Sequence, residues 1–284
     1  MSAEDPKIPS FWSNEPLLGE DEIFAALGES RGTSLFLGKF TMAEVMAVLG
    51  RRGFIKEARK RGLWPVVTDL DSSAYPCQRL RIFTREASPE TLIVDLKIRE
   101  GIFSPRAILG PEAMLRDFSA LFLEWLTLQH PLAGFSGTRA ALPGQHHPGL
   151  GMSRRIVDVF FYLGKVTRKD ALLAFPAYYH NAVLFSRFFR FLNPVKEAEV
   201  LALHRTLSHM PIKSLAWAVH LNCVRKADGT VYEWQAEEQV AALARDLRDH
   251  FDSKAYREAV KDSLSRFRFT LDAEEFDRKV GSFD

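Results

Sequence analysis

Hydrophobic residues recur at helical spacing in the first quarter of the chain. Thr41 and Glu44 have the spacing of a helix-capping box and stand directly before such a run, where side chain and backbone satisfy each other at a helix start. Gly53 interrupts the pattern and Gly62 ends it, because glycine is favoured just beyond a helix C-terminus. The pattern predicts helices over residues 21–27, 41–49 and 54–61.

After residue 62 the chain changes to short runs rich in Val, Ile, Leu, Phe and Thr. Residues 92–98 alternate in their second half, as a half-buried strand does. Turn-forming residues at 71–73 and 87–90 separate consecutive runs, which indicates an antiparallel meander. Strands are expected at 64–70, 79–84, 91–99 and 122–129, and the pattern at 111–120 also fits a short helix.

Five glycines and prolines interrupt residues 129–145, which we interpret as a loop. The pattern then predicts a helix over 152–167, a strand over 171–175 and a helix over 181–191 that Asn193-Pro194 would end. Beyond residue 195 it is typical of helices broken near Met210-Pro211, with a hairpin over 224–234 that turns at Asp228-Gly229.

This mixture of strands and helices, without internal repeats, predicts an α+β protein. The composition, 46% hydrophobic and 26% charged, is that of a globular chain with a substantial core. Only the first 15 residues mix Pro, Ser and acidic residues without periodicity. We divide the chain into a helical N-terminal region (1–62), an α+β core (63–194) and a mainly helical C-terminal region (195–284).

Charge and cysteine usage exclude several classes of function. A net charge of +2 does not favour a nucleic-acid partner, and we interpret the basic cluster within residues 51–61 as a solvated helix face. Cys77 and Cys223 are too far apart in sequence for a disulfide scaffold or a cysteine-rich zinc site. No apolar run approaches the roughly 20 residues that span a bilayer, and no signal-like segment begins the chain, so we expect a cytoplasmic protein without a membrane span.

The most informative segment is residues 122–194, where strand, glycine-rich loop, helix, strand and helix follow one another. Gly149 and Gly151 stand directly ahead of the predicted helix. The unpaired N–H groups and positive dipole end of a helix start attract phosphate, and glycine lets the backbone approach it closely. The segment therefore predicts a phosphate-binding loop, with a simple turn as the alternative.

This order of elements resembles the GNAT acyltransferase superfamily, whose pyrophosphate loop reads Q/R-x-x-G-x-G/A before a long helix. Gly149 and Gly151 match its glycines, His146 stands at the Gln/Arg position, and Gln145 lies one position early. Asn181 begins a run similar to the family's N-x-x-A-x-x-L-Y-x-x-x-G-F helix.

The resemblance implies a mixed, mostly antiparallel sheet flanked by helices, with helical extensions at both ends. The strands at 122–129 and 171–175 are then parallel neighbours that separate at their C-terminal ends. It also implies acyl-CoA as co-substrate, held by Gln145, His146, His147, Gly149, Leu150, Gly151, Met152, Ser153 and Asn181.

Acyl transfer to an amine needs a base, donors for the tetrahedral oxyanion and an acid for the leaving thiolate. The family's base is often a Glu on the strand before the loop, where Glu124 stands among apolar residues that would raise its pKa. Strand alternation puts Glu124 on one face with Leu126 and Leu128. Phe185 replaces the family's Tyr acid, so its substitutes are sought among Tyr178, Tyr179 and His180. Aromatic packing is the alternative role for these three residues, and a solvent-facing or paired carboxylate is the alternative for Glu124.

No metal site is expected, because the chain has no H-E-x-x-H motif and the adjacent His146 and His147 are poorly placed to share one ion.

The resemblance predicts an acyl-CoA-dependent acyltransferase that acts on a small-molecule or peptide amine. The departures at Gln145 and Phe185 leave a rival open. The rival is a catalytically inactive GNAT-like protein whose Phe-rich surface binds a protein partner or an apolar small molecule.

Overall fold

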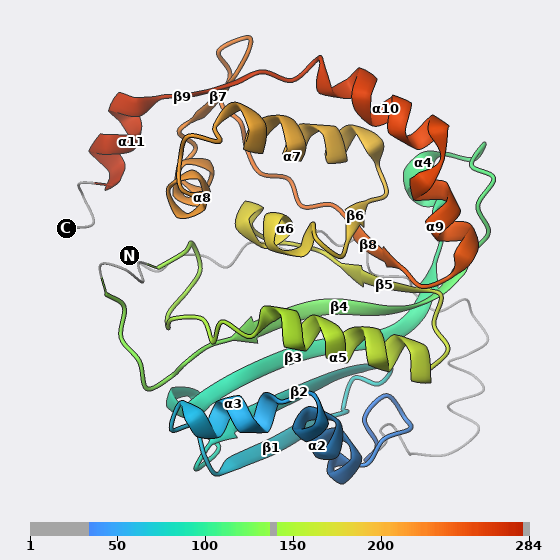
Figure 1. The fold of residues 1–284 in the computed structure, drawn as a ribbon, viewed down its shortest axis with the longest axis vertical. Helices are drawn as coiled ribbons and strands as arrows, with labels where there is room; N and C mark the ends of the chain where they lie inside the picture. Colours follow the sequence, from blue (N-terminus) through green and yellow to red (C-terminus); the bar gives the residue numbers. More distant parts are fainter. Residues whose placement is uncertain (1–33, 137–140, 281–284) are drawn as a thin grey trace.

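The computed structural model describes residues 34–136 and 141–280. The helix expected at 21–27 and the irregular first 15 residues lie outside this part of the chain. The described chain is an α+β fold with a seven-stranded mixed sheet, flanking helices and a separate two-stranded sheet (Figure 1). The predicted fold class is confirmed at this level.

The large sheet has the strand order β1-β2-β3-β4-β5-β8-β6. Its first four strands form the expected antiparallel meander, β4 and β5 are parallel, and β8 runs antiparallel to both β5 and β6. The strands are β1 Val66–Asp71, β2 Cys77–Thr84, β3 Leu92–Phe103, β4 Phe118–Leu128, β5 Ala171–Ala174, β6 Arg190–Phe191 and β8 Gln239–Ala242. The small sheet pairs β7 Val224–Lys226 with β9 Phe269–Leu271.

Three helices cover one face of the meander: α2 Met42–Arg51, α3 Phe54–Lys60 and α5 Ser153–Val166 (Figure 1). The expected capping box starts α2, where Thr41 and Glu44 hydrogen-bond each other. Gly53 separates α2 from α3 with a φ of +79°, a left-handed conformation that favours glycine. The apolar faces of these helices pack against alternate residues of the strands, such as Leu96 and Leu126, to form the first core.

The second half of the chain builds two further cores. One lies among α6, α7, α8 and the small sheet, and the other lies between the sheet and helices α9 and α10. These helices are α6 Tyr179–Phe185, α7 Pro194–Thr206, α8 Ile212–His220, α9 Arg245–Asp252 and α10 Lys254–Leu264. A further helix, α11 Ala273–Val280, follows the small sheet. Two short helical turns, η2 Pro89–Thr91 and α4 Arg106–Leu109, connect strands of the meander.

The prediction of a short helix at 111–120 is wrong. A helical turn occurs earlier, in α4, and β4 already begins at Phe118. Phe118 pairs with Phe103 of β3, and Ala120 pairs with Ala171 of β5. Pairing with neighbours distant in sequence outweighs the local helical preference of this segment.

The helix expected over 181–191 is also wrong in length. Helix α6 ends at Phe185, and Arg190–Phe191 forms a strand that pairs with β8. Asn193 caps the next helix through Val195 N–H, and Pro194 is that helix's first residue. The dipeptide therefore starts a helix here, because a proline at the first position loses no intrahelical hydrogen bond.

The C-terminal region is joined to the core by β8, which lies between β5 and β6 in the large sheet. No strand was predicted there. The turn at Asp228-Gly229 is confirmed, because the Lys226 N–H donates to Thr230 O at 2.8 Å and Arg225 bridges to Val231. On its other edge, β7 pairs with β9 from near the C-terminus.

Candidate functional site

The parallel strands β4 and β5 stay paired over four residues only, from Ala120↔Ala171 to Leu123↔Ala174. Strand β4 then continues to Leu128 while the chain after β5 leaves the sheet for α6 (Figure 1). Farther along, the Leu150 N–H donates to Leu128 O at 3.4 Å, so the 148–150 segment takes the place of a strand there. Between these two points, residues 124–127 of β4 have no strand partner on this edge within the described chain.

A β-bulge lies at Glu124, where the two strands begin to separate. Lys97 pairs with Trp125 and Ile98 with Leu123, so Glu124 is an extra residue on β4. The bulge shifts the alternation by one residue, and Leu123 and Leu126 therefore both face the first core. The predicted face pattern, with Glu124 on the same side as Leu126, is wrong for this reason.

Glu124 is held in a double ion pair on the sheet face opposite α5. Arg99 Nε donates to its Oε1 at 2.7 Å, Lys97 Nζ lies 3.0 Å from its Oε2, and Cys77 Sγ lies 3.4 Å from Oε2. Burial alone would raise the pKa of Glu124, but the hydrogen bonds from Lys97 and Arg99 outweigh burial and hold the pKa below its ordinary value. The predicted rise is wrong, and both oxygens of this carboxylate are engaged by cationic side chains.

The glycine loop meets the start of α5 as expected. Gly149 and Gly151 are exposed, and Gly151 has a φ of +64°. Met152 is the N-cap residue, and no side chain caps the helix within the described residues. The N–H groups of its first turn, which have no partners inside the helix, therefore point toward the loop.

The first turn of α5 carries two arginines, Arg154 and Arg155, and no acidic residue. Cations at a helix N-terminus are unfavourable with the helix dipole unless an anion is present. Arg155 also reaches the turn between α2 and α3, where its Nη1 lies 3.4 Å from Arg52 O and its Nη2 lies 3.6 Å from Glu57 Oε1. The start of α5 is thus electropositive.

The loop before α5 is hydrogen-bonded on both sides of the point where β4 and β5 separate. The His130 N–H donates to Pro148 O at 2.7 Å on the β4 side, and Trp217 Nε1 of α8 donates to Ala141 O at 2.8 Å on the other. Gln145 is half-buried, and its Oε1 accepts from the Leu142 N–H at 3.1 Å. The remaining predicted loop residues differ in burial: His146 and Ser153 are exposed, His147 is half-buried, and Leu150 and Met152 are buried.

Tyr178 and His180 come together beside this loop. Their rings stack with centroids 5.5 Å apart, and a Cβ built on Gly144 would lie 2.5 Å from Tyr178 Oη. His220 of α8 joins them, with its ring 5.8 Å from that of Tyr178. Nothing in the spacing of the sequence indicated His220 or Trp217, since only the packing of α8 against α6 brings them here.

His180 is 4% exposed, and its Nδ1 is buried without a hydrogen-bond partner in the described chain. Burial lowers its pKa to about 4, and neighbouring His220 adds to this effect. The imidazole is therefore neutral at pH 7 and its unpartnered nitrogen can accept a hydrogen bond, although a pKa of about 4 makes it a weak base.

The other predicted residues of this segment lie apart from the Tyr178–His180 pair. Tyr179 points into the second core, where its ring lies 5.7 Å from that of Trp234, and Asn181 is half-buried on α6. Phe185, at the family's Tyr position, packs against the first core. A hydroxyl at that position would therefore be of little use as an acid.

The pKa of His180 predicts a pH dependence of stability. Between about pH 6.5 and 4 the unfolded chain binds a proton that the folded His180 does not, so stability falls as pH falls through this window. His180→Gln removes this contribution. Thermal unfolding of both proteins at several pH values should show the variant losing less stability between pH 7 and about 4.5. Parallel losses would contradict the assignment.

The described residues hold no group of three or more His, Cys, Asp or Glu that could bind a metal ion, and no described helix is long and apolar enough to cross a membrane. Comparison with protein-family models, curated proteins and solved structures finds no match to this chain.

Proposed function

We propose that this chain is an acyl-CoA-dependent acyltransferase that acts on an amine. The observation that carries the proposal is the parallel β4–β5 pair, which is paired over only four residues and is connected by a glycine loop and helix α5. Such an opening at the carboxyl ends of parallel strands is where open α/β sheets bind ligands.

The phosphates of CoA would bind at the start of α5. The uncapped N–H groups there, the exposed Gly149 and Gly151, and the two arginines of the first turn together favour a multiply charged anion. Arg154 is exposed and Arg155 lies at the α2–α3 turn, so they can approach a phosphate chain from the side of α3.

The pantetheine arm of CoA carries amide groups, which can pair with a strand edge. Residues 124–127 of β4 offer such an edge between the end of β5 and the 148–150 segment. An extended arm that leaves the start of α5 along this edge would place the thioester toward the point where β4 and β5 separate.

In the transfer, the amine nitrogen attacks the thioester carbon, the C–S bond breaks, and one amine proton must be accepted. We assign the proton acceptor to His180, because its neutral imidazole has a buried Nδ1 without a partner in the described chain, whereas both oxygens of Glu124 are engaged by Arg99 and Lys97. Tyr178, stacked on His180, is the candidate donor to the leaving thiolate. Because His180 is shielded from solvent, the amine substrate reaches it only when the loop that packs on Tyr178 moves aside.

Acetyl-CoA should raise the melting temperature of the protein, since a ligand that binds only the folded state stabilises it by mass action. At about 100 times the Kd the gain in stability is roughly 2.7 kcal/mol, which corresponds to a shift of several degrees. Adenosine and pantetheine, each lacking the pyrophosphate, serve as controls and should give little or no shift. An unchanged melting curve at millimolar acetyl-CoA would favour the non-catalytic rival.

A further inference from the structure

A pocket is lined by residues of the α4–β4 connection and of helix α9. These two segments lie at the opposite end of β4 from the glycine loop (Figure 1). The pocket volume is about 400 Å³, which is within the range of small-molecule sites. Strand β4 has 11 residues, so roughly 30 Å separates the two regions at about 3.3 Å per residue. Its lining residues are Leu109, Glu112, Ala113, Met114, Leu115, Asp246 and His250.

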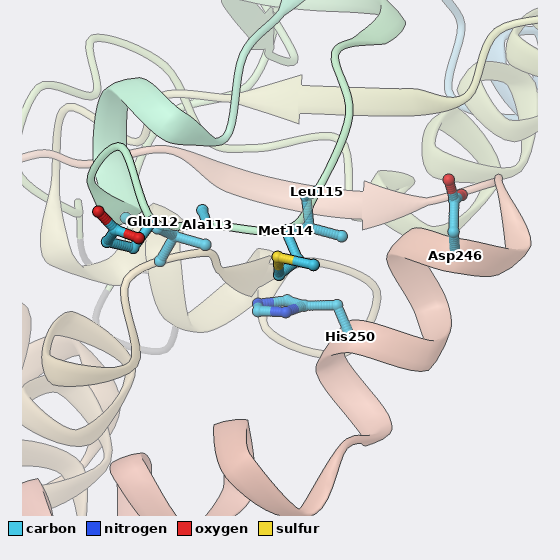
Figure 2. A pocket seen from close by; sticks show the side chains of 7 residues that line it. Glu112, Ala113, Met114, Leu115, Asp246 and His250 are labelled. Atoms are coloured by element: carbon cyan, nitrogen blue, oxygen red, sulfur yellow. The ribbon is translucent and has the colours of Figure 1, made fainter.

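The pocket combines apolar walls with an imidazole that lacks a partner. Leu109 and Leu115 pack against the third core, and Met114, 97% exposed, forms the lip. Figure 2 shows the His250 ring beneath Met114, with its nitrogen-bearing edge turned away from α9 toward the connection that carries Glu112. His250 Nε2 is buried and has no hydrogen-bond partner in the described residues. A ligand that donates an N–H or O–H group to such an atom removes the free-energy cost of leaving it without a hydrogen bond.

The charged groups that line the pocket are carboxylates. Glu112 is exposed and Asp246 lies on the α9 side, and neither Lys nor Arg is among the lining residues. The guanidinium of Arg116 is engaged outside the lining, at 2.9 Å from Asp246 Oδ2 and 3.1 Å from Asp170 Oδ2. Arg106 is likewise occupied, since its Nε donates to Ala113 O at 3.3 Å.

We propose that this pocket binds a small organic amine in its ammonium form, with an apolar body. The ammonium group can donate to the Glu112 carboxylate and to His250 Nε2, while the apolar body covers Leu109, Met114 and Leu115. Burial and nearby Arg190 lower the pKa of His250, so the imidazole stays neutral near pH 7 and accepts this hydrogen bond. The site is independent of the proposed acyl-CoA site.

Titration with phenethylamine, followed by NMR of the intact protein, tests the proposal. Phenethyl alcohol is the uncharged match and phenylacetate the anionic one. The amine should bind at least about tenfold more tightly than either, because only the ammonium group satisfies both polar partners. Equal binding of the amine and the alcohol, or no binding of the amine at about 10 mM, would overturn the proposal.

Three variants locate the binding. Glu112→Gln should lower the affinity for the amine by about tenfold or more. Glu86→Gln, at an exposed carboxylate on the β2–β3 connection, is the control and should bind the amine as the wild type does. His250→Phe keeps a ring and removes the unpaired nitrogen, so it should lose amine affinity without lowering the melting temperature. Unchanged affinity in both Glu112→Gln and His250→Phe would place any binding elsewhere and refute the site.

Discussion

Replacement of Gly149 by valine should abolish the binding of acetyl-CoA while the fold remains intact. Gly149 is exposed, and a Cβ built there makes only ordinary contacts, 3.8 Å from Leu128 O and 3.9 Å from Gln145 Nε2. Its φ is not in the left-handed region, so the substitution introduces no backbone strain. A valine side chain would instead occupy the space through which a phosphate approaches the start of α5.

We expect the Kd for acetyl-CoA to rise by more than about 100-fold, with a change in stability within about 0.5 kcal/mol. Gly134→Val is the matched control, because Gly134 also lacks a positive φ and has no atom within 4 Å of its Cβ position. Calorimetric titration and thermal unfolding of both variants measure the two quantities. Retained affinity in Gly149→Val would exclude this loop as the phosphate site.

Replacement of His180 by glutamine should lower the rate of acyl transfer by about 100-fold or more, the usual contribution of a general base. Glutamine can hydrogen-bond but cannot accept a proton at neutral pH. The Kd for acetyl-CoA should not change, since the start of α5 remains intact. A pKa of about 4 also predicts that wild-type turnover does not lose this base down to about pH 5.

Glu124→Gln is the informative comparison, because the sequence predicted Glu124 as the general base. It should reduce turnover by less than about tenfold, and it should cost roughly 1 kcal/mol of stability by weakening the ion pairs with Lys97 and Arg99. A larger loss of turnover in Glu124→Gln than in His180→Gln would return the role of base to the carboxylate.

Local signals predicted the elements near the site well. The Thr41–Glu44 capping box, the breaks at Gly53 and Gly62, and the helix that follows Gly151 all depend on residues close in sequence. The parallel arrangement of the strands at 122–129 and 171–175 followed from the order of elements and is confirmed for β4 and β5.

Features that depend on distant partners were not predicted. The bulge at Glu124 exists because β3 and β4 pair with a register shift, which no local pattern reveals. The short α6 reflects pairing of Arg190–Phe191 with β8, some 50 residues later. His220 and Trp217 reach the loop only because α8 packs beside α6. These parts of the candidate site are therefore a product of tertiary packing.

Hydrogen–deuterium exchange of the wild-type chain with and without acetyl-CoA tests the central claim most directly. The amides at residues 149–156, in the glycine loop and the first turn of α5, should exchange more slowly when the ligand saturates the protein. The connection at 110–117, at the far end of β4, should be unaffected. Unchanged exchange at 149–156, or protection confined to another part of the chain, would contradict the proposal that this loop binds acyl-CoA.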